Sequence, residues 1–204
     1  MRVICSFVCL VATVVLLNAC SILPKPAPVA INQYLFEYAS ASQAERKITT
    51  DAPVIVIAVP RADAGYDSTR IAYKREDYGL RYYTLSRWAD TPARMLAPLL
   101  AAAVQATGQF HALYATPGLV AADLRLDTEL VRFYQDFRST PSEIRITLRA
   151  RLIDHDKGRV IASWLVDRTT PAESDDAYGG VVAANRLLGQ VLDELARFCA
   201  SVRP

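Results

Sequence analysis

Cys20 is the residue of this 204-residue chain whose neighbours most clearly predict chemistry. It follows Leu17, Asn18 and Ala19 at the junction between an apolar run and a polar chain. The small side chain of Ala19 would give a peptidase access to the backbone, and a cysteine thiol is a nucleophile that can accept a diacylglycerol group. Cleavage before Cys20 would free its amine for a third acyl chain. We therefore predict that Cys20 is a lipid-attachment site.

The segment before Cys20 has the pattern of a secretory signal peptide. Arg2 is followed by an apolar run over residues 3–17, which at 15 residues is shorter than the roughly 20 residues of a membrane span. Residues 17–20 resemble a bacterial lipobox, from which Asn18 is a modest departure. An ordinary signal peptide with an accidental cysteine and an uncleaved anchor are the alternatives that stay open.

Localisation and domain organisation follow from the lipid prediction. Two or three acyl chains anchor a protein stably, and Ser21 stands where an aspartate would retain a lipoprotein at the inner membrane. We therefore expect attachment to the periplasmic face of a bacterial outer membrane. Alternating prolines after Cys20 favour an extended tether. The predicted organisation is a signal peptide at 1–19, the lipidated cysteine and tether at 20–31, and a single α/β domain at 32–204.

Composition and cysteine use narrow the classes of function. Lys and Arg exceed Asp and Glu by 23 − 21 = 2, a balance that does not suit nucleic-acid binding through bulk charge. The positive mean hydropathy of +0.14 comes from the signal peptide, because the rest of the chain averages slightly below zero. Cys5 and Cys9 leave with that peptide and Cys20 carries lipid, so Cys199 is the remaining thiol. We expect it to be a small buried apolar residue.

The other side chains that are suited to catalysis lack the spacing that catalysis needs. His155 lies between two aspartates in a predicted turn, and His111 lies at a predicted helix-to-strand junction. No Cys/His cluster has zinc spacing, and no nucleophile elbow, phosphate loop or dinucleotide glycine pattern occurs. Asp175 and Asp176 fit helix capping better than paired acid–base chemistry. We therefore expect neither an enzyme nor a site for a metal or cofactor.

The first half of the domain predicts short strands and one helix. Apolar and aromatic runs predict strands at 33–38, 54–59, 70–73 and 80–88, and the second of these should be covered on both faces. Thr91 and Pro92 are a strong helix start, since threonine caps free amides and proline is preset for the first turn. Pro98 should distort the first turns, which would move the start of the helix later.

The second half predicts longer strands and a long helix. Period-two alternation indicates strands near 124–131, 144–152 and 160–166, with a turn at 154–158. The outward arginines should pair with Asp127 and Glu129 in a salt-bridged sheet face, with an anion-binding face as the alternative. A helix over about 176–200, capped by Ser174 or Asp175, contains Gly179-Gly180, which either weaken it or allow close packing. The fold class is therefore α/β, a mixed β-sheet with two main helices.

One cluster of aromatic and arginine side chains predicts an interaction surface. Tyr78, Tyr82, Tyr83, Arg87 and Trp88 fall within eleven residues, directly before the first main helix. Tyrosine, tryptophan and arginine are enriched among the residues that dominate binding at protein interfaces. We expect the cluster to dock a partner protein or another copy of the chain. The alternative is that Trp88 and one tyrosine belong to the core, because Tyr82 and Tyr83 point to opposite faces of a strand.

An ordered set of short motifs accompanies this cluster. The most specific is Tyr-Tyr-x-x-x-Arg-Trp-Ala-x-x-Pro at 82–92. The others, in chain order, are the lipobox and proline-containing tether, Tyr34-Leu35, Val59-Pro60, Ile71-Ala72-Tyr73-Lys74, Phe-Tyr-Gln-Asp-Phe at 133–137 and Gly-Val-Val-Ala-Ala-Asn at 180–185. Together they resemble the ABC-type transport auxiliary lipoprotein family over nearly all of residues 20–200.

The resemblance implies a fold similar to the anticodon-binding or TolB N-terminal architecture, and a function. Such a protein would be an outer-membrane lipoprotein that works with an inner-membrane ABC permease and ATPase and with a periplasmic mammalian-cell-entry (MCE) protein. The system would move lipids or other hydrophobic molecules between the membranes. A periplasmic carrier of lipid or another hydrophobic ligand, and a structural outer-membrane assembly lipoprotein, are the alternatives.

Overall fold

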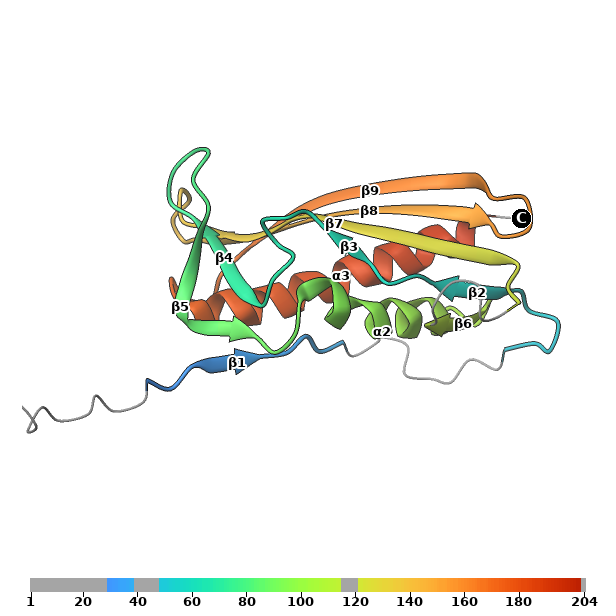
Figure 1. The fold of residues 1–204 in the computed structure, drawn as a ribbon, viewed down its shortest axis with the longest axis horizontal. Coiled ribbons are helices and arrows are strands. Elements are labelled where there is room, and N and C mark those ends of the chain that lie inside the picture. The colour runs from blue at the N-terminus through green and yellow to red at the C-terminus, as the bar shows by residue number, and fades with distance from the viewer. Residues whose placement is uncertain (1–28, 39–47, 115–120, 203–204) are drawn as a thin grey trace, which may run out of the picture. The chain divides into compact units, whose positions relative to one another are not determined.

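The computed structural model describes residues 29–38, 48–114 and 121–202. Within these ranges nine strands form one mixed sheet and two helices pack against it (Figure 1), so the predicted fold class is confirmed. The elements, in chain order, are β1 (Asn32–Tyr34), β2 (Val54–Ile57), β3 (Arg61–Ala62), β4 (Arg70–Lys74), β5 (Arg81–Trp88), α2 (Pro92–Gln105), β6 (His111–Tyr114), β7 (Leu124–Asp136), β8 (Glu143–Asp154), β9 (Arg159–Pro171) and α3 (Ala177–Ser201).

β7 is the strand that organises the sheet. One of its edges carries three short parallel strands in succession, with β2 opposite 124–126, β3 opposite 129–130 and β4 opposite 135–136. Its other edge pairs with antiparallel β8, which in turn pairs with β9. β5 pairs antiparallel with β4, while β1 joins β5 and β6 joins β2 as parallel strands. The short strands are therefore placed by their positions along β7.

The core lies between the helices and one face of this sheet. Alternate residues of β8 are buried, as the period-two pattern predicted, with Ile146, Leu148 and Leu152 each at most 2% exposed. β7 alternates in the same way until a bulge after Leu130 shifts its register, and Phe133 then takes the buried face. The bulge thus returns an apolar side chain to the buried face beyond the point where the register shifts. Figure 1 shows α2 and α3 packed on this face beside each other.

α2 begins at Pro92, and Pro98 lies inside it, so the expected later start is wrong. Pro98 is on the exposed side of the helix, where the carbonyl group left without its N–H partner can bind water. Thr91 is the N-cap residue, as predicted, but its side chain makes no capping hydrogen bond. Proline at the first position is thus the start signal that the structure uses.

α3 is capped by Asp176 rather than by Ser174 or Asp175. The carboxylate of Asp176 accepts a hydrogen bond from the Gly179 N–H over 2.7 Å. The two glycines permit close packing, since a Cβ on Gly179 would overlap the backbone of Ser174 and a Cβ on Gly180 would overlap a buried glutamine of β7. Close packing is therefore the interpretation of Gly179-Gly180 that the structure favours.

Two predicted strands are shorter than expected. β1 ends at Tyr34 because the backbone beyond it bonds to α3, where Asn185 Oδ1 accepts from the Glu37 N–H over 2.8 Å. β2 ends at Ile57, and it lies between β7 and β6. Ile55 and Val56 point to opposite faces of β2 and both are buried, as predicted for a covered strand.

The face of the sheet opposite the helices carries ion pairs. Arg149 of β8 pairs with Glu129 of β7 over 2.6 Å, and Arg145 of β8 pairs with Asp167 of β9. Hydrogen bonding from Arg145 holds the pKa of Asp167 below its usual range. The predicted salt-bridged face is confirmed for these pairs, with the difference that Asp127 pairs with Arg125 of its own strand.

Candidate functional site

The predicted interaction cluster lies on the hairpin formed by β4 and β5. β4 is attached to the C-terminal end of β7, and β5 is attached on its far side to β1. The hairpin pairing is irregular, because Ala72 faces Tyr82 but Arg70 faces Arg87. β5 changes direction across this irregularity (Figure 1). The five predicted residues are consequently distributed over three environments: the hairpin tip, an open pocket and the core.

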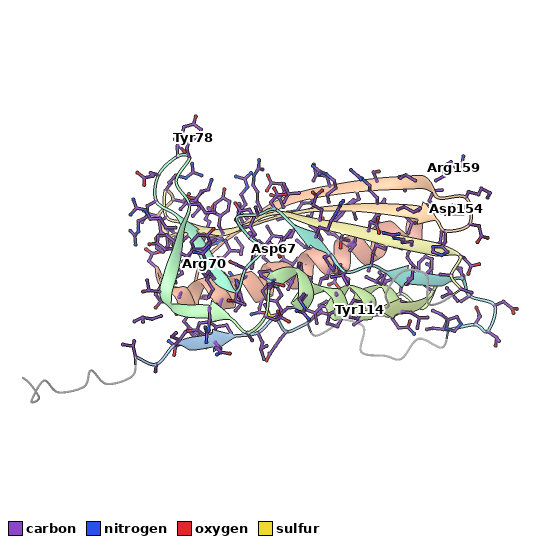
Figure 2. The ribbon with its side chains drawn as sticks, viewed as in Figure 1. Asp67, Arg70, Tyr78, Tyr114, Asp154 and Arg159 are labelled. Atoms are coloured by element: carbon purple, nitrogen blue, oxygen red, sulfur yellow. The ribbon has the colours of Figure 1, made fainter. Side chains whose placement is uncertain are left out.

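Tyr78 occupies the tip of the hairpin and is completely exposed, at 102% of its reference surface. Its φ of 62° lies in the left-handed region, which a tyrosine rarely adopts. The neighbouring side chains brace the loop, since Asp77 pairs with Arg138 and Glu76 pairs with Arg81 over 2.6 Å. Figure 2 shows Tyr78 directed away from the body of the hairpin. The loop therefore presents an aromatic ring that has no role in the core.

Trp88 lies in the core, as the alternative interpretation had it. It is 3% exposed and contacts Phe36 edge to face at 4.7 Å and Phe133 in a stacked arrangement at 5.4 Å between ring centroids. Its neighbours come from the segment after β1 and from β7. Trp88 therefore fixes the end of β5 and does not present its ring to a partner.

Tyr82 and Tyr83 point to opposite faces of β5, but each is half-buried. The Tyr82 hydroxyl donates to the carbonyl oxygen of Gly65 over 3.0 Å. The Tyr83 hydroxyl donates to Gln135 Oε1 over 2.9 Å, and burial raises the pKa of this hydroxyl. Only Tyr83 packs against the core, in keeping with the limit of at most one core tyrosine, and neither ring is fully buried or fully exposed because both faces of the hairpin have a partial cover.

Gln135 is a buried polar residue that joins the hairpin to α3. Its Nε2 donates to Ser142 Oγ over 2.9 Å, and the Ser142 N–H donates to Asp175 over 2.9 Å. Hydrogen bonding from Ser142 lowers the pKa of Asp175. The Phe-Tyr-Gln-Asp-Phe and Gly-Val-Val-Ala-Ala-Asn motifs meet here, since Gly180 packs against Gln135. The contact between the two motifs thus fixes Gln135, which in turn bonds to Tyr83 of the hairpin.

Tyr82, Tyr83 and Arg87 line an open pocket of about 390 Å³. Arg70 also lines it, with its guanidinium carbon 3.8 Å from the centroid of the Tyr82 ring. The remaining lining residues are Ile31, Thr69, Thr84 and Ser86. Arg70 was not among the predicted site residues, because its place beside Arg87 depends on the irregular strand register. A basic residue at the start of the predicted strand at 70–73 was the available signal.

The chemistry of this region is that of recognition. The groups that reach solvent are tyrosine rings, hydroxyls and guanidinium groups, which stack on and hydrogen-bond to a partner. In the part of the chain that the structure describes, no three His, Cys, Asp or Glu side chains are grouped as metal ligands, and no helix is long and apolar enough to span a membrane. Cys20, the predicted lipid-attachment site, lies outside the described residues.

Comparisons with known proteins bear on the whole chain. A family model described as the ABC-type transport auxiliary lipoprotein component matches residues 34–196. No curated protein matches the chain. The solved structure of protein XCC0632 from Xanthomonas campestris, assigned to the family model DUF330, is similar at 24% identity, covering 80% of this chain and 92% of that one with a TM-score of 0.70. The structure of an uncharacterized protein is similar at 12% identity, covering 83% of this chain and 99% of that one with a TM-score of 0.66.

Proposed function

Because the chain belongs to the family of ABC-type transport auxiliary lipoprotein components, we propose that it is the lipid-anchored docking subunit of an ABC transport system. Residues 1–19 direct export, Cys20 carries the lipid, and residues 20–31 tether the domain at 32–204 to the periplasmic face of the outer membrane. The partners are a periplasmic MCE protein and an inner-membrane permease and ATPase. The cargo is a lipid or another hydrophobic molecule, and the chain itself catalyses no reaction.

The observation that carries the docking role is Tyr78. A large aromatic side chain at 102% exposure, in a backbone conformation that costs energy, has no explanation in the stability of the isolated domain. The ion pairs of Asp77 and Glu76 with their partners reduce the entropy that the loop would lose on binding. A braced tyrosine that becomes buried on docking has the properties of a binding hot spot.

The test compares two exposed tyrosines in the full-length lipidated protein. Tyr78→Ser should weaken co-purification with the MCE partner and the permease–ATPase complex by tenfold or more, which corresponds to about 1.4 kcal/mol or more of binding free energy. Tyr114→Ser is the matched control, because Tyr114 is 48% exposed on β6, away from the hairpin (Figure 2). Both variants should unfold at the temperature of the wild type.

Equal capture of the partners by wild type and Tyr78→Ser would contradict the docking role of the hairpin tip. Native mass spectrometry of the extracted protein separates the other functions. A defined complex without bound lipid supports docking, whether the second component is a partner or another copy of the chain. A stoichiometric co-purifying lipid would instead support a carrier.

A further inference from the structure

We propose that the pocket between β4, β5 and the start of β1 binds a carboxylate from an acidic segment of the docking partner, held between Arg70 and Arg87. This inference deepens the proposed function and rests on it, since it assigns the chemistry of the partner at a second point on the hairpin. Figure 2 shows Arg70 at the start of β4, away from the hairpin tip that carries Tyr78. The pocket and the hairpin tip are therefore separate contact points for the partner.

Two like charges face each other across the strand pair at this point. Arg70 and Arg87 are direct Cα partners in the β4–β5 register, and both side chains are exposed. Like charges directly opposite on neighbouring strands destabilise a sheet. A carboxylate placed between them would turn this repulsion into two attractions.

No carboxylate of residues 29–38, 48–114 or 121–202 is paired with either arginine. On β8 of the same sheet, Arg145 and Arg149 are both paired across strands with carboxylates of this chain. Arg145 and Arg149 therefore have counter-ions within this chain, whereas the two arginines beside the pocket have none among the residues that the structure describes.

The arginine on β4 is held in position for binding. Its guanidinium group lies over the Tyr82 ring at 3.8 Å, and the Tyr82 hydroxyl is fixed by its hydrogen bond to Gly65. Stacking uses the flat face of a guanidinium and leaves its N–H edge free to donate two parallel hydrogen bonds to a carboxylate. Less side-chain entropy is then lost when the ligand binds.

The shape of the pocket favours a polypeptide side chain as the occupant. A volume of about 390 Å³ accommodates a glutamate and parts of its neighbours. Ile31 and the tyrosine rings offer apolar walls for the aliphatic stem, and the hydroxyls of Thr69 and Thr84 offer further donors. A side chain reaches into such a hollow, whereas a bilayer presents its phosphates as a plane.

Thermal unfolding of the full-length lipidated protein in detergent tests the proposal, with glutarate as the probe at constant ionic strength against chloride. Glutarate should raise the Tm of the wild type by about 3 °C at ten times its Kd, because a ligand that binds the folded state stabilises it. Arg70→Gln and Arg87→Gln should each lose this shift. Arg159→Gln is the control, since Arg159 is exposed at the start of β9 (Figure 2) and should respond like the wild type.

The repulsion between Arg70 and Arg87 can also be tested by comparing Tm values in the absence of glutarate. In chloride, Arg87→Gln should unfold at or above the Tm of the wild type, because it removes one of the opposed charges, whereas Arg70→Gln also loses the stack on Tyr82 and should be the less stable of the two. An equal response to glutarate in all four proteins would overturn the proposal. A shift with inorganic phosphate and none with glutarate would also overturn it, by identifying a phosphate site.

Failure of the proposed function has a different signature. If Tyr78→Ser still co-purifies with the partners while the Tm shift with glutarate depends on Arg70 and Arg87, the carboxylate site is supported and the docking role of the hairpin tip is wrong. If Tyr78→Ser loses its partners and glutarate has no effect on any variant, docking stands and the carboxylate site is wrong.

Discussion

The hydroxyl of Tyr83 donates to Gln135 Oε1 across 2.9 Å, and this bond joins the β4–β5 hairpin to β7. The acceptor is 1% exposed, and its amide nitrogen is already bonded to Ser142. The residue that partly buries Tyr83 therefore also connects the hairpin, through Ser142, to Asp175 just before α3.

Tyr83→Phe should lower the free energy of unfolding by about 1–2 kcal/mol, because a buried acceptor loses its donor. Urea denaturation followed by circular dichroism measures the change. Tyr78→Phe is the matched control and should leave the free energy unchanged, since the Tyr78 side chain is fully exposed. Equal stability of Tyr83→Phe and the wild type would show that Gln135 finds another donor.

Gly180→Ala should destabilise the protein by about 1–3 kcal/mol through overpacking. The new Cβ would overlap Oε1 of Gln135 and lie 2.9 Å from its Cδ, and the hydrogen bonds of that side chain prevent it from moving away. Gly189→Ala, in the same helix, meets no atom within 4 Å and should stabilise by about 0.5–1 kcal/mol. The pair of variants separates packing from helix propensity. Opposite signs in denaturation are expected, and a gain in both would contradict the close packing.

Cys199 should make the protein less stable at high pH. Burial raises the pKa of its thiol from 9.0 to about 12. Between these values the unfolded chain loses a proton that the folded protein keeps, so stability falls as pH rises, by about 1.4 kcal/mol at pH 10. Below pH 9 the contribution is fully present. Denaturation at pH 8, 9 and 10 should show a shallower decline in Cys199→Ala than in the wild type, and parallel declines would be evidence against the shift.

Cys20→Ala should abolish incorporation of a fatty-acid analogue during growth and release the protein from the membrane fraction. Cys199→Ala is the control and should label like the wild type, because its thiol is buried in α3. Unchanged labelling of Cys20→Ala would place the lipid elsewhere or remove the lipoprotein prediction altogether.

The strands of the second half could be predicted because their signal is local. Leu148 and its neighbours on β8 alternate with arginines over a whole strand, and the turn at 154–158 follows directly. The long C-terminal helix has an equally continuous apolar stripe. Pro98 is the contrasting case, because its effect on α2 depends on whether the freed carbonyl faces water or core.

The candidate site could be predicted only in part. A cluster of adjacent aromatics pointed to Tyr82 and Tyr83, but the neighbour that stacks on Tyr82 is twelve residues earlier in the chain. Its position opposite Arg87 arises where the β4–β5 register is irregular, which residue types alone do not specify. Likewise, nothing local relates Gly180 to Gln135, because this contact forms only when α3 packs on β7.

The arrangement of three parallel strands along one edge of β7 sets an order of assembly. β2, β3 and β4 lie between residues 54 and 74, while their common partner begins at residue 124. A chain that crosses a membrane from its N-terminus therefore delivers these strands well before the edge they need. β7, β8 and β9 are joined by short turns and can pair at once, so we expect the sheet to grow backward from its C-terminal meander. Until then, the early strands lack their partner and are exposed to aggregation, so the chain most needs protection in the interval before residue 136 has emerged.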